Sequence, residues 1–71
     1  MKLAIGRDYR VTEAVVGIHR VELVDADNHE TVGYVLEAGH VFVSLQGPVY
    51  NTSIEIGQSL DLDSAVHLLT R

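Results

Sequence analysis

Cysteine is absent from this chain of 71 residues, and its absence excludes several kinds of site. Without thiols the protein forms no disulfide, no thiolate zinc site, no iron–sulfur cluster and no cysteine nucleophile. A domain of this size buries only about 60% of the surface that its unfolded chain exposes. Small domains without disulfides gain stability by other means, of which self-association is the simplest. We therefore expect a homodimer or a higher oligomer.

Basic side chains are scarce in the sequence. One lysine and four arginines stand against ten acidic residues, which gives a formal net charge of −5 with the histidines neutral. Nucleic-acid binding requires clustered Lys and Arg, but only Arg7 and Arg10 lie close together, and Asp8 separates them. The charge therefore predicts no direct nucleic-acid binding. It remains compatible with a basic protein partner, because electrostatic attraction would speed that encounter.

Long apolar runs are missing as well. No stretch approaches the roughly 20 residues of a membrane-spanning helix or the roughly 7–15 residues of a secretory signal core. Hydrophobic residues nevertheless make up 46% of the chain, as in ordinary globular domains. We expect a single small domain over residues 1–71, located in the cytoplasm and not attached to a membrane.

Apolar residues recur with a period of two through the middle of the chain, which predicts β-strands. The alternating positions are Val32, Tyr34, Leu36, Val41, Val43 and Leu45. Upstream, Val21 and Leu23 share one face of a strand. Val16 and Ile18 have the other parity, and a bulge near His19 would bring them to the same side. Residues 6–14 are ambiguous, with strand or loop favoured over a short helix.

The C-terminal segment changes its period. Four apolar residues at i, i+3, i+4 and i+7 predict a helix, and they are Leu62, Ala65, Val66 and Leu69. Asp61 is a natural N-cap, Asp63 suits the first turn, and Leu60 is placed to pack on Ala65. The polar segment 25–30 reads as a hairpin tip. The predicted fold is α+β, a small antiparallel β-meander of four to five strands with one C-terminal α-helix packed on the sheet.

The sequence shows no pattern of a catalytic or metal site. His19, His29, His40 and His67 lack the short spacing of zinc motifs, although a sheet could still bring His19 and His40 together. No serine stands in a G-x-S-x-G context, and the glycines are dispersed. We therefore predict no metal, no cofactor and no enzymatic activity.

The surface offers one irregularity, the position of Phe42. If Val41 and Val43 face the core, Phe42 points outward, and Val35 stands beside it on the neighbouring strand. Exposed apolar residues on a sheet face mark protein interfaces, so we predict that Val35, Phe42 and Tyr50 line one. The alternative is that the N-terminal segment covers this face. The predicted function is a small non-enzymatic protein-binding module, homodimeric, of unknown biological role.

Two alternatives remain open at this point. The first is an acidic inhibitor or antagonist that occupies a basic groove of a nucleic-acid-handling protein. Its acidic surface would consist of Asp25, Asp27, Glu30, Asp61 and Asp63. The second is a metal-binding or pH-responsive module built on histidines.

Overall fold

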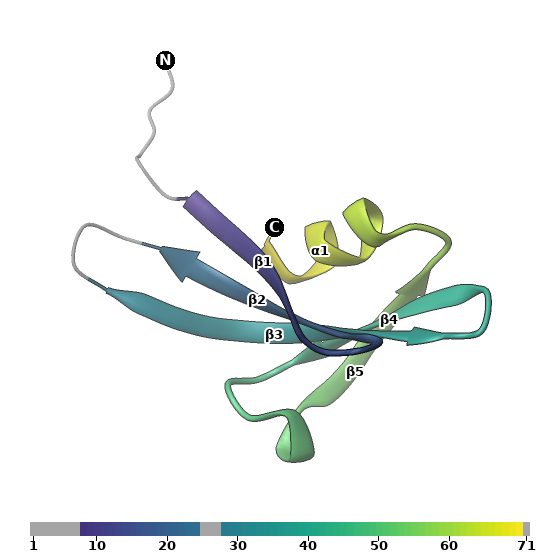
Figure 1. The fold of residues 1–71 in the computed structure, drawn as a ribbon, viewed down its shortest axis with the longest axis horizontal. Coiled ribbons are helices and arrows are strands. Elements are labelled where there is room, and N and C mark those ends of the chain that lie inside the picture. Colours follow the sequence, from purple (N-terminus) through teal and green to yellow (C-terminus); the bar gives the residue numbers. More distant parts are fainter. Residues whose placement is uncertain (1–7, 25–27, 71) are drawn as a thin grey trace.

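The computed structural model describes residues 8–24 and 28–70, which form one five-stranded sheet and a C-terminal helix (Figure 1). The elements are β1 (Asp8–Val15), β2 (Ile18–Val24), β3 (His29–Ala38), β4 (Val41–Gln46), the 3-10 turn η1 (Tyr50–Thr52), β5 (Ile54–Ser59) and α1 (Leu62–Thr70). The strands follow one another across the sheet in chain order, each antiparallel to the next. The predicted α+β meander with one helix is therefore confirmed.

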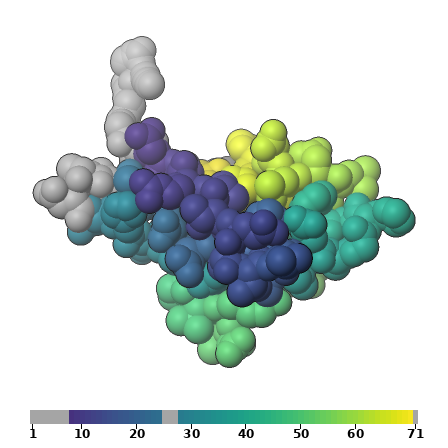
Figure 2. All heavy atoms as spheres, in the orientation of Figure 1, coloured from purple at the N-terminus to yellow at the C-terminus, as the bar shows by residue number. Residues whose placement is uncertain are grey.

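The ambiguous N-terminal segment is a strand from Asp8 onward, and residues 6 and 7 lie outside the described part. β1 forms one edge of the sheet, and all eight of its residues are exposed. Figure 2 shows this strand, in purple and dark blue, on the near surface of the molecule. Of the predicted hairpin tip, residues 25–27 also lie outside the described part, while His29 and Glu30 already belong to β3.

The helix begins where its sequence predicts. The carboxylate of Asp61 accepts a hydrogen bond from the backbone N–H of Ser64 at 2.8 Å, which is an N-cap. Asp63 lies in the first turn, where the helix dipole favours a negative charge. The expected packing of Leu60 on Ala65 is wrong, because Leu60 is 81% exposed.

The main core lies between α1 and one face of the sheet. Ala65 and Leu69 of the helix pack against Val21 and Val35 of the sheet, and all four are buried. α1 contacts β3, β4 and β5. Its approach depends on small residues beneath it. A Cβ built on Gly33 would lie 2.7 Å from Leu69 Cδ2, which is closer than packed side chains allow.

The alternation of the strands is as predicted, but the helix covers the other face of the sheet. Val35 is fully buried beneath α1, and Phe42 packs against the same core. In the register, Val35 pairs with Ser44 and Glu37 pairs with Phe42, so Val41, Val43 and Leu45 point to the face opposite the helix. The expectation that Phe42 and Val35 form an outward face is therefore wrong. The C-terminal helix covers them.

The β-bulges also lie elsewhere than expected. The register shift beside His19 places its extra residue in β1, between Glu13 and Val15, so β2 keeps its alternation and Ile18 stays on the face opposite to Val21. The shift between β2 and β3 falls opposite Val32 instead. A bulged residue and its successor point to the same side, which explains why Val32 packs against the core beneath α1 although Tyr34 does not.

Candidate functional site

The sheet face opposite α1 carries a row of apolar side chains. Ile18, Leu36 and Val43 are direct neighbours across β2, β3 and β4, and Val15 of β1 pairs with Ile18 at the edge of this row. Val43 is buried, Ile18 and Leu36 are half-buried, and Val15 is exposed. We name this surface the open face, defined by Ile18, Tyr34, Leu36, Val41, Val43 and Leu45. α1 lies on the other face of the sheet.

A polar rim borders the open face. Arg20 pairs with Tyr34 in the register, and its Nη1 lies 4.0 Å from the carboxylate of Glu22. On the far side, Glu55 pairs with Leu45. Protein–protein interfaces combine an apolar centre with a polar rim and are enriched in tyrosine and arginine.

Tyr50 contacts one residue of the open face, Tyr34. Its ring meets the ring of Tyr34 edge-on, with the centroids 5.6 Å apart and an interplanar angle of 83°. The hydroxyl of Tyr34 donates a hydrogen bond to the carbonyl oxygen of Pro48 at 3.0 Å. Of the three predicted interface residues, Tyr50 is thus the one at this face. Val35 has no accessible surface, and Phe42 lies on the helix-covered side.

The predicted acidic surface is not brought together in the described part of the chain. Asp25 and Asp27 lie outside it. Glu30 stands near the start of β3, whereas Asp61 and Asp63 stand at the start of α1, on the opposite side of the view (Figure 1). Asp61 is also engaged as the helix cap.

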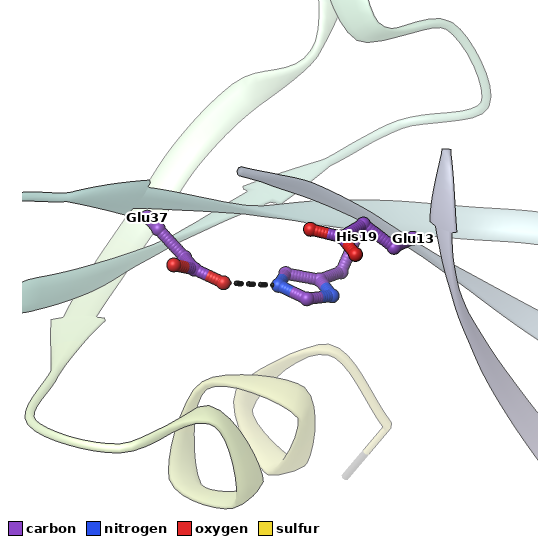
Figure 3. A group of neighbouring side chains, drawn as sticks. All are labelled: Glu13, His19 and Glu37. Atoms are coloured by element: carbon purple, nitrogen blue, oxygen red, sulfur yellow. Dashed lines mark hydrogen bonds and ion pairs between the residues drawn. The ribbon is translucent and has the colours of Figure 1, made fainter. Parts of the chain in front are cut away.

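The structure assembles a second site from three neighbouring strands, which we name the Glu–His–Glu cluster. Glu13 of β1, His19 of β2 and Glu37 of β3 each offer one ligand atom, and these three atoms lie within 4.8 Å of one another. His19 Nε2 lies 2.6 Å from Glu37 Oε2. The carboxylates of Glu13 and Glu37 both turn toward the imidazole of His19 (Figure 3).

The register explains why the three side chains meet. Glu13 and His19 are direct partners across β1 and β2, so their side chains share a face. His19 is the partner of Val35, and Glu37 stands two residues further along β3 on that same face. The Glu–His–Glu cluster therefore lies on the face that α1 covers in part.

The turn between β1 and β2 fixes both carboxylate-bearing strands. The backbone N–H of Gly17 donates to Glu13 Oε2 at 3.2 Å, and the carbonyl oxygen of Gly17 accepts from the backbone N–H of Glu37 at 2.8 Å. Gly17 has a φ of +84°, a left-handed conformation that glycine adopts without steric cost. One residue thus joins the two strands that flank His19.

The spacing between the four histidines could not reveal this cluster, because its other two members are glutamates. His29, His40 and His67 are exposed and belong to no such group among the described residues. The useful signal lay in the strand register. A pairing of Glu13 with His19 follows once 8–15 is recognised as a strand joined to the next by a short turn.

No family model, curated protein or solved structure matches this chain. Within residues 8–24 and 28–70 there is no pocket, and no helix is long and apolar enough to cross a membrane.

Proposed function

We propose that this protein is a small protein-binding module that associates with a second copy of itself through the open face. The observation that carries the proposal is the apolar row of Ile18, Leu36 and Val43, which crosses three strands on the side of the sheet that α1 leaves uncovered. Contiguous apolar surface bordered by polar residues is typical of interfaces and uncommon elsewhere on small proteins.

The size of the core favours a second copy as the occupant. Only five hydrophobic residues of the described chain are buried, and four of them form the cluster between α1 and the sheet. The fifth, Val43, lies at the open face. A domain with so small a core and no disulfide gains stability when a second apolar layer covers its other face.

The charges at the rim suit a symmetric arrangement. Arg20 lies on one side of the open face and Glu55 on the other. In a two-fold interface the same patch meets itself, so the arginine of each copy can approach a glutamate of the other. Elsewhere the net charge of −5 makes two copies repel, which leaves the neutral open face as the favoured contact.

Light scattering on a sizing column, over at least a tenfold range of concentration, tests the proposal. We expect the wild-type chain to show the mass of a dimer at high concentration. Leu36→Glu introduces a charge at the centre of the open face and should give a monomer. Leu60→Glu is the matched control, because the same charge change at a leucine that is 81% exposed and outside the set that defines the open face should leave the dimer intact.

A second variant keeps the test valid if Leu36→Glu does not fold. Arg20→Glu changes a partly exposed rim residue, so the fold should survive while like charges oppose association. Circular dichroism of each variant verifies its folding. A wild-type monomer at every concentration would overturn the proposal, and so would a dimer that both folded variants retain.

A further inference from the structure

We propose that the Glu–His–Glu cluster is a binding site for a divalent transition-metal ion, with Zn²⁺ as the preferred ion. Its ligand atoms would be the carboxylate oxygens of Glu13 and Glu37 and the imidazole Nε2 of His19. Imidazole nitrogen and carboxylate oxygen are both common zinc ligands in proteins. The inference rests on a surface separate from the open face and does not depend on the proposed dimer.

The charge balance around the cluster favours a cation. Two carboxylates stand within 4.8 Å of the same imidazole nitrogen and of each other. The described residues include only two arginines, Arg10 and Arg20, and both alternate to the opposite face of the sheet. Apart from His19 itself, no arginine or lysine within residues 8–24 and 28–70 therefore faces the two carboxylates from their own side.

The distances suit a zinc ion after small movements. Bonds of about 2.0–2.1 Å in a tetrahedral arrangement place neighbouring ligand atoms about 3.3 Å apart. The His19–Glu37 contact at 2.6 Å would open slightly to admit the ion, and the widest separation within the cluster, at most 4.8 Å, would close. Rotation of the glutamate side chains can supply such changes, because Glu13 and Glu37 are both exposed.

The framework around the ligands is already fixed. His19 is mostly buried, with its side chain 12% exposed, so its ring is held in place before an ion binds. The backbone of Gly17 bonds to the Glu13 carboxylate and to the Glu37 amide. Hydrogen bonds that orient the ligands in this way commonly tighten metal sites. Three protein ligands leave a fourth position of the tetrahedron for water or a donor from another molecule.

The types of ligand atom also favour Zn²⁺ over Ca²⁺ and Mg²⁺. Ca²⁺ binds through oxygen and takes more oxygen ligands than two glutamates supply, and Mg²⁺ also binds through oxygen, with water completing its octahedron, so neither ion needs the imidazole. Zn²⁺ accepts the imidazole nitrogen readily, so replacement of His19 should matter for zinc and hardly at all for calcium.

Isothermal titration of the full chain, without a histidine tag, with Zn²⁺ alone tests the site. We expect one ion per chain for the wild type. His19→Gln and Glu37→Gln should each weaken binding at least about tenfold, since even the loss of an outer hydrogen-bond partner has that effect at metal sites. His40→Gln is the matched control, because His40 is exposed in a turn outside the cluster, and it should bind as the wild type does.

Nuclear magnetic resonance of the histidine rings keeps the test decisive if a variant fails to fold. In the wild-type protein, Zn²⁺ should shift the Nε2 resonance of His19 and leave those of His29, His40 and His67 in place. Absence of zinc binding would overturn the site, as would binding that His19→Gln leaves unchanged or ring shifts confined to the other histidines. Equal affinity for Ca²⁺, independent of His19, would overturn the assignment of the ion.

Discussion

The hydroxyl of Ser44 donates a hydrogen bond to the carbonyl oxygen of Ala65 at 2.8 Å, and both residues are completely buried. This bond joins the centre of β4 to the middle of α1 across the apolar core. Within the described chain, no buried side-chain nitrogen or oxygen lacks a hydrogen-bond partner. The helix is therefore positioned by a polar contact as well as by apolar packing.

Removal of this hydroxyl should destabilise the fold. We expect Ser44→Ala to lower the free energy of unfolding by about 0.5–1.5 kcal/mol, because the hydrogen bond to Ala65 is lost inside the core. Urea unfolding followed by circular dichroism measures the change. Ser64→Ala, at an exposed serine of the same helix, should stay within about 0.5 kcal/mol of the wild type. Equal effects of the two substitutions would argue against a role for the Ser44 bond.

Two glycines beneath the helix should respond differently to an added methyl group. A Cβ at Gly33 would lie 2.4 Å from the backbone oxygen of Leu45, whereas a Cβ at Gly57 would meet only the side-chain tip of Leu68, at 2.9 Å. A backbone carbonyl cannot move aside as a leucine methyl can. Gly33→Ala should therefore lower the free energy of unfolding by about 1–3 kcal/mol, and Gly57→Ala by clearly less. A reversed order in thermal unfolding would contradict this packing.

Replacement of Phe42 should lower the stability of the fold and leave self-association unchanged. Its ring packs on the core between α1 and the sheet, so Phe42→Ala should lower the free energy of unfolding by about 2 kcal/mol, less than for a fully buried ring. The molar mass of the folded variant should match that of the wild type. Val49→Ala, at an exposed apolar residue, serves as the stability control. Loss of the dimer with unchanged stability would place Phe42 at the interface instead.

The fold could be predicted from the sequence because its signals are local. The period of Leu62, Ala65, Val66 and Leu69 specifies a helix, and the alternation in 32–45 specifies strands. Which face of the sheet the helix covers is not a local property, since both faces carry apolar residues. The positions of Gly33 and Gly57 indicate which face the helix covers. Both lie inside strands, and a Cβ at either position would meet a leucine of the helix.

The candidate sites were harder to predict for a related reason. The interface role of Tyr50 stays a prediction, and its contact with Tyr34 follows only from the folded turn. The Glu–His–Glu cluster depends on residues that are 18 and 24 positions from Glu37, brought together by the order of three strands. Spacing in the sequence cannot show such a meeting unless the register is known.

An isotope-filtered nuclear Overhauser experiment on an equal mixture of labelled and unlabelled protein tests the central claim most directly. It detects contacts between two copies only, so contacts within one chain do not contribute. We expect intermolecular signals at the methyl groups of Ile18, Leu36 and Val43, and none at Ala65 or Leu69 on the buried side of the helix. Absence of intermolecular signals at the open face, in a sample concentrated enough to associate, would contradict the account.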